Sequence, residues 1–105
     1  MAVLEGNPKD EQLFTFRVRT TKPFVLPLHT HPRNERVTVL EGALYVGFGN
    51  AVDKAASTRF EVGDYYVNRA GASHFVWSDE PMTIQLTGIG PWAIRPVEEM
   101  KAATD

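Results

Sequence analysis

The stretch from Leu28 to Gly42 reads LHTHPRNERVTVLEG, and it decides the fold prediction. It contains two histidines two residues apart, a carboxylate four residues further on, and an apolar run that ends in glycine. Because residues two apart on a strand point to the same face, His29 and His31 can converge on one point. Pro32 interrupts the pairing of that strand because it has no N–H to donate. Glu35 then opens the next strand within reach of the same point, which gives an incomplete metal site.

The rest of the chain alternates between short apolar runs and turn residues. Phe14, Phe16 and Val18 alternate with polar residues, as in a half-buried strand. Strands are predicted at residues 2–4, 12–20, 24–29, 36–41, 44–49, 58–62, 65–68, 73–77, 82–87 and 92–95. Residues 50–57 are expected to form a loop with one helical turn, and residues 97–103 a short C-terminal helix or tail. This pattern predicts an all-β fold, and periodicity alone leaves a sandwich and a barrel open.

Length and composition limit the possible functions. The 105 residues predict a single domain over 1–105 with a formal charge of −2. The absence of a basic stripe argues against nucleic acid as a partner. No apolar run reaches the roughly 20 residues that span a bilayer, and no secretory signal is evident, so the default expectation is a cytoplasmic protein without a membrane partner. The chain has no cysteine, which excludes thiolate metal sites and cysteine nucleophiles.

The third histidine of the chain, His74, lies in the predicted strand 73–77. If that strand lies beside the strand of His29 and His31, His74 supplies the missing ligand. Three imidazole nitrogens and one carboxylate suit a divalent transition metal such as Fe, Mn, Ni, Cu, Co or Zn. A ligand set of this kind usually leaves positions open for water, dioxygen or a chelating substrate.

Two motifs make the sequence resemble the cupin superfamily. The first, at residues 29–42, is a histidine pair around one residue, then glutamate after three residues and glycine after six more, and this chain meets every spacing. The second, at residues 63–78, is matched by Gly63, Gly71 and His74. Arg69 stands where the family has proline and Ser78 where it has asparagine.

This resemblance implies a small antiparallel jelly-roll β-barrel with a metal inside its mouth. It also implies that His29, His31, Glu35 and His74 are the metal ligands. Members of the superfamily usually pair, so a homodimer is expected.

Other interpretations of the same residues remain open at this point. Glu35 could instead form a surface salt bridge with Arg33 or Arg36. Gln85, in the middle of a predicted strand among apolar neighbours, is a candidate pocket residue that would need a hydrogen-bond partner. Aromatic residues such as Trp92 are expected to fill or cap the barrel. Strand parity places Val37 and Val39 inward with Glu35, and Val76 inward with His74, so the lining of the cavity is predicted to be apolar.

These features favour a metal-dependent enzyme. A dioxygenase-type oxidoreductase acting on a small chelating substrate, such as a diketone, enol or polyphenol, is expected, because the lining offers few groups for proton transfer. The alternative is a non-catalytic metal-bound module that senses or binds a small ligand.

Overall fold

The computed structural model describes residues 1–97 of the chain. Within this part the chain forms ten strands and one short 3-10 helix, η1. The elements are β1 (Ala2–Glu5), β2 (Leu13–Thr20), β3 (Phe24–Thr30), β4 (Glu35–Glu41), β5 (Ala43–Phe48), η1 (Lys54–Ala56), β6 (Thr58–Glu61), β7 (Tyr65–Asn68), β8 (His74–Ser78), β9 (Met82–Ile89) and β10 (Arg95–Pro96). No helix among these residues is long and apolar enough to cross a membrane.

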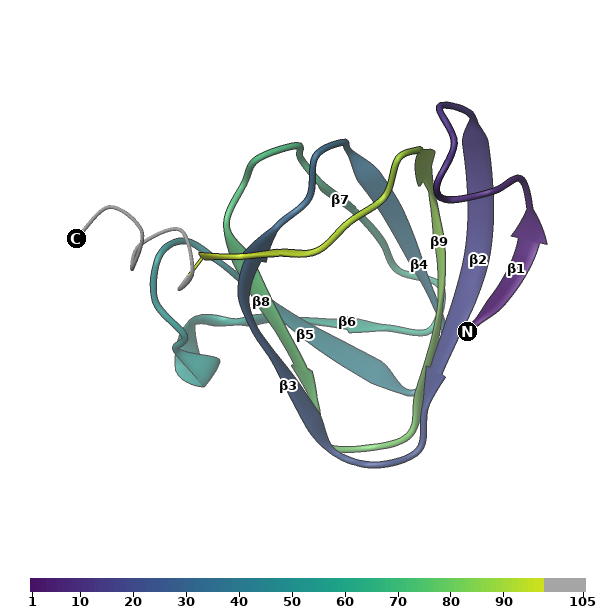
Figure 1. Cartoon of the computed structure of the whole chain (residues 1–105). Coiled ribbons are helices and arrows are strands. Elements are labelled where there is room, and N and C mark those ends of the chain that lie inside the picture. The colour runs from purple at the N-terminus through teal and green to yellow at the C-terminus, as the bar shows by residue number, and fades with distance from the viewer. Residues whose placement is uncertain (98–105) are drawn as a thin grey trace.

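The strands form two five-stranded sheets that face each other (Figure 1). Sheet A has the order β1-β2-β9-β4-β7, and sheet B has the order β10-β3-β8-β5-β6. Every pairing is antiparallel. Neighbouring strands in these orders are mostly distant in sequence, as when β2 pairs with β9. The two facing sheets confirm the all-β jelly-roll architecture that the resemblance implied.

The space between the sheets is filled by apolar side chains, most of them from β2, β4, β5 and β9. In β9 the side chains of Met82, Ile84 and Leu86 are buried, whereas the alternate residues are partly exposed. Val37 and Val39 of β4 are buried beside them, which confirms the predicted inward parity of this strand. The alternation of burial with a period of two is what a sheet with one solvated face requires.

The two departures from the cupin motif pattern fall on a turn and a strand end. Ser78, at the usual asparagine position, is buried, and its hydroxyl donates to the carbonyl of Ala43 at 2.7 Å. The serine therefore joins the end of β8 to the start of β5. Arg69, at the usual proline position, accepts a turn hydrogen bond at its carbonyl from the amide of Ala72.

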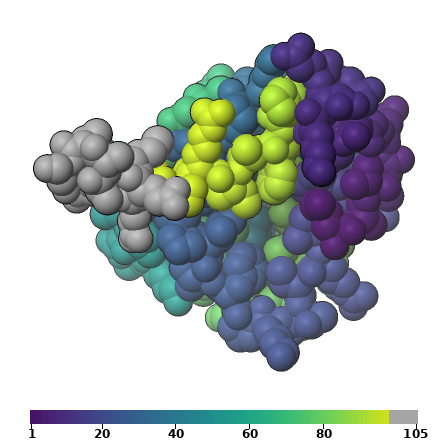
Figure 2. Space-filling model, in the orientation of Figure 1, coloured from purple at the N-terminus to yellow at the C-terminus, as the bar shows by residue number. Residues whose placement is uncertain are grey.

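The segment after β9 differs from its prediction as a strand at residues 92–95. Residues 91–94 have no regular secondary structure, and pairing begins only in β10, at Arg95 opposite Thr30. The amide of Trp92 donates instead to the carbonyl of Pro8, so it is not available for a sheet ladder. This segment crosses from sheet A to sheet B, and Figure 2 shows it on the surface between the N-terminal strands and β3.

The two predicted helical segments have different outcomes. The single turn expected within residues 50–57 is confirmed as η1, and the side chain of Asp53 accepts a hydrogen bond from the amide of Ala55 at its start. Residues 98–103 of the predicted C-terminal helix lie outside the described residues.

Candidate metal centre

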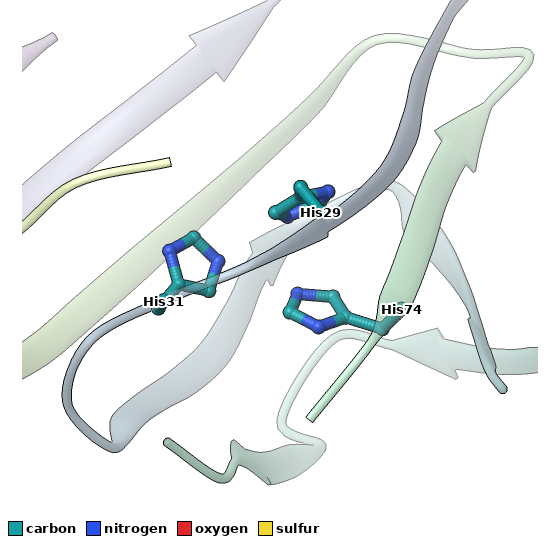
Figure 3. A group of neighbouring side chains, drawn as sticks. All are labelled: His29, His31 and His74. Atoms are coloured by element: carbon teal, nitrogen blue, oxygen red, sulfur yellow. The ribbon is translucent and has the colours of Figure 1, made fainter. Parts of the chain in front are cut away.

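Two neighbouring strands of sheet B bring the three histidines together. β3 pairs with β8 so that His29 lies opposite His74, and His31 follows two residues after His29. The pairing is irregular between Leu26 and His29, where Pro27 cannot donate to a ladder. One ring nitrogen from each histidine lies within 4.8 Å of the others. Figure 3 shows the three rings turned toward a common space.

Each histidine ring is oriented by a backbone carbonyl. The Nδ1 atoms of His29, His31 and His74 lie 2.7, 2.8 and 3.0 Å from the carbonyl oxygens of Pro27, Ala93 and Ala72. A carbonyl oxygen can only accept, so each Nδ1 must carry a proton and donate. The lone pair of each neutral ring is then on Nε2. Metal-binding histidines are held in this way, with the second nitrogen bonded to a protein acceptor.

Burial of His29 and His74 favours their neutral form, which is the form that binds cations. The three side chains are 0–3% exposed. Burial lowers the pKa of His74 to about 4 and also lowers the pKa of His29. The Nε2 atom of His74 is buried and has no hydrogen-bond partner. Because a buried polar atom without a partner is costly, this nitrogen fits a site that is completed by a metal ion.

Glu35, at the start of β4, lies beside His31, whereas the group of donor atoms within 4.8 Å of one another comprises the three histidines without it. Its Oε1 lies 3.1 Å from Nε2 of His31. Two donor atoms that each lie about 2.1 Å from one ion, at a right angle, are about 3 Å apart, so this spacing suits two ligands of the same ion. With Nδ1 already donating, the contact otherwise requires a second proton on the His31 ring. Glu35 is 3% exposed, so it is not the surface salt-bridge residue considered as an alternative.

Three side chains hold the Glu35 carboxylate in place. The amide Nδ2 of Asn68 donates to Oε1, and the indole Nε1 of Trp92 donates to Oε2 at 2.8 Å. Burial acts to raise the pKa of Glu35, but the contact with the His31 ring, together with these two donors, holds the pKa below its usual value. The carboxylate is therefore a negative charge that is already partnered within the protein.

A small cavity lies next to this cluster between the two sheets. Its volume is about 180 Å³. The lining is mostly apolar, and the four predicted ligands contribute to it. The lining residues are Phe16, Val18, Leu26, His29, His31, Glu35, Val37, Tyr66, Asn68, His74, Val76, Ile84, Leu86, Trp92 and Ile94.

The structure places Gln85 away from this cavity, and its predicted pocket role is wrong. Gln85 belongs to the outer face of β9, because Ile84 and Leu86 on either side of it face inward. Its Oε1 accepts a hydrogen bond from Nε of Arg17 on the neighbouring strand at 3.0 Å. The strand alternation of residues 82–87 in the sequence was a signal for this outward placement.

Sequence reasoning missed two residues that contact the Glu35 carboxylate, Asn68 and Trp92. The parity of β7 carried a signal for Asn68, because Asn68 is two residues from the aromatic Tyr66 and shares its buried face. Trp92 was expected only to fill or cap the barrel. Its hydrogen bond depends on the path of residues 91–94 across the barrel, and no periodic pattern predicts such a path.

Known proteins resemble this chain in sequence and in structure. Germin-like protein 8-11 of rice, Oryza sativa subsp. japonica, is 47% identical over 58 residues, which cover 52% of this chain and 26% of the rice protein. The chain thus spans about a quarter of that relative's length. A solved oxalate oxidase is 25% identical with a TM-score of 0.64, over 81% of this chain and 46% of that one.

A second solved structure shows likeness in fold alone. A salicylate 1,2-dioxygenase variant from Pseudoaminobacter salicylatoxidans, in complex with gentisate, has a TM-score of 0.67 at 14% identity, over 81% of this chain and 24% of that one. The family model described as Cupin matches residues 5–90, which is more than half of the sequence. The chain belongs to the cupin family.

Proposed function

We propose that this protein is a metal-dependent oxygenase that acts on a small chelating organic substrate. The observation that carries the proposal is the convergence of three Nε2 lone pairs, each fixed by a carbonyl at Nδ1, beside an apolar cavity. We assign His29, His31 and His74 as ligands of one divalent transition metal ion, with Glu35 as the fourth. The likeness to an oxalate oxidase and a dioxygenase is consistent with this class of chemistry.

The metal, when bound, supplies a Lewis acid or redox centre at which the substrate and dioxygen are activated. The protein's residues hold and orient the reactants and limit access of water. The carbonyls of Pro27, Ala93 and Ala72 fix the three rings, and Trp92 and Asn68 fix the carboxylate. Apolar side chains such as Val37 and Leu86 surround the space in which a substrate would lie.

The size of the cavity limits the substrate. At roughly 30 Å³ for each water, a volume of about 180 Å³ holds about six waters. This favours a substrate of a few heavy atoms, such as a short diketone or enol, over a polyphenol of several rings.

Oxygen uptake tests the catalytic proposal. Protein loaded with iron, manganese or nickel is mixed with a panel of short diketones, enols and single-ring phenols in an oxygen electrode. We expect uptake that depends on both the metal and the substrate, and no uptake by a His74→Ala variant treated in the same way. Binding of a panel member without uptake under any metal would instead favour the non-catalytic sensing or binding module.

Two further expectations stay predictions. The family resemblance predicts a homodimer, and sedimentation of the purified chain tests this. The cytoplasmic location also stays an expectation, and fractionation of the source cells tests it.

A further inference from the structure

Asn68, like His74, is a buried lining residue whose side chain donates one hydrogen bond and leaves a second polar atom without a partner. It lies on β7 opposite Glu35 in the sheet register, and its side chain is 1% exposed. Its amide donates to the Glu35 carboxylate through Nδ2, whereas its Oδ1 is buried and has no hydrogen-bond partner.

The orientation of the Asn68 amide follows from its partner. A carboxylate has only acceptor atoms, so the amide must present its NH₂ group to Glu35. The carbonyl oxygen of the amide then faces away from the carboxylate. An unpaired acceptor in a buried site is costly, which makes Oδ1 an atom that gains from a donor on a bound molecule.

Apart from Nε2 of His74, which is assigned to the metal, and the hydroxyl of Tyr66, which lies near the Asn68 amide, the other polar groups of the cavity wall are already committed. The indole N–H of Trp92 donates to Glu35, and the Nδ1–H groups of the three histidines donate to carbonyls. The described lining residues include no lysine or arginine. A dicarboxylate such as oxalate, which has two negative charges and no donor, would find no cationic side chain here to balance it.

We propose that Oδ1 of Asn68 accepts a hydrogen bond from a hydroxyl group of the substrate, so that the site selects small hydroxyl-bearing chelators such as α-hydroxyketones over acceptor-only chelators such as oxalate. The inference rests on the proposed metal centre, because it places the chelating atoms of the substrate at the histidines. It assigns Asn68 a specificity-determining role in addition to its bond with Glu35.

Binding of matched probes to the cobalt(II)-loaded protein tests this role by visible absorption. The probes are acetoin, which carries a hydroxyl, and butane-2,3-dione and oxalate, which carry none at neutral pH. The ratio of the acetoin and butanedione dissociation constants is compared between the wild type and Asn68→Leu, so that the intrinsic chelating strength of each probe cancels. In Asn68→Leu, we expect the acetoin dissociation constant to rise about tenfold relative to that of butanedione. The ratio of the oxalate and butanedione dissociation constants should stay unchanged.

A matched variant separates this role from the support of Glu35. Trp92→Phe removes a donor from the same carboxylate but keeps Oδ1 of Asn68, so the acetoin ratio should stay at the wild-type value. An unchanged ratio in Asn68→Leu, or an equal shift in Trp92→Phe, would overturn the proposal.

A second measurement needs no variant. The methyl ether of acetoin should bind the wild type about tenfold more weakly than acetoin, because the donor is lost. Equal binding of the two would also overturn the proposal. The failure of cobalt to bind at all is a different result, because it would refute the metal centre rather than only the role of Asn68.

Discussion

The two sheets contribute polar groups of opposite character to the same cavity. From sheet B, Nε2 of His74 is buried without a hydrogen-bond partner. From sheet A, the Glu35 carboxylate contacts His31, Asn68 and Trp92, and both of its oxygens are engaged. The His74 ring nitrogen therefore lacks a partner, whereas both oxygens of the Glu35 carboxylate already have one.

This difference indicates that His74 and Glu35 contribute to different properties of the protein. His74 of sheet B is costly to keep buried unless a cation binds its free nitrogen, so we expect it to contribute mainly to metal affinity. The carboxylate of sheet A also holds together the side chains that donate to it, so its contribution includes the stability of the metal-free fold. We therefore expect substitution of His74 to lower mainly the metal affinity, and substitution of Glu35 to lower also the stability of the metal-free protein.

The largest expected effect is on metal binding. His74→Ala removes one of three imidazole ligands, and we expect the affinity for zinc or manganese to fall by roughly a hundredfold or more. Elemental analysis after equilibrium dialysis measures this. Gln85→Ala, on the outer face of β9, is the matched control and should keep the wild-type metal content. Equal metal content in wild type and His74→Ala would show that His74 is not a ligand.

The next effect is on the stability of the metal-free protein. Glu35→Gln leaves buried donors without a charged acceptor, and we expect the free energy of unfolding to fall by about 2–4 kcal/mol. Urea unfolding in the presence of a chelator measures it. His74→Gln should change the same quantity by less than about 1 kcal/mol, since it disturbs fewer hydrogen bonds. A larger loss of unfolding free energy in His74→Gln than in Glu35→Gln would show that His74, and not Glu35, stabilises the metal-free fold.

A change of pH is expected to have a smaller effect on the stability of the metal-free protein. Burial holds the pKa of His74 at about 4 in the folded protein, below the usual 6.5 of a histidine, so between these values the unfolded chain binds a proton that the folded chain excludes. The stability of the metal-free protein is then full above about pH 6.5 and falls by up to about 3 kcal/mol as the pH drops to about 4. The lowered pKa of Glu35 acts in the same direction, below about pH 4.5.

Urea unfolding at a series of pH values checks this dependence. His74→Gln cannot take up that proton in the unfolded state, so its stability should fall less steeply between pH 6.5 and 4.5. An identical slope in the variant and the wild type would show that His74 does not carry the effect.

Residue spacing predicted the strands and an all-β fold, whereas the jelly-roll barrel and the set of four candidate ligands were implied by the resemblance to the cupin superfamily. Alternating runs located the strands, because a half-buried strand imposes a period of two on its residues. The order of the strands in each sheet was not readable from these runs. The pairing of β2 with β9, for example, depends on contacts between segments about 70 residues apart, and the same alternation fits many partners.

The polar groups around Glu35 were harder to predict than the ligands. His29 lies in β3 and His31 directly follows its end, so their proximity follows from local geometry. Asn68 and Trp92 reach Glu35 from distant segments, and Trp92 does so from a stretch without regular structure. Such contacts depend on tertiary packing and have no periodic signature in the sequence.

X-ray absorption at the metal edge tests the assignment of the three histidine ligands, because it counts the imidazoles bound to the ion. For the zinc-loaded protein, we expect three imidazole nitrogens at about 2.0–2.1 Å from the zinc, together with an oxygen ligand. His74→Ala should show two imidazoles at most. A wild-type spectrum that contains only oxygen ligands, or fewer than three imidazoles, would contradict the assignment of the three histidines as the metal centre.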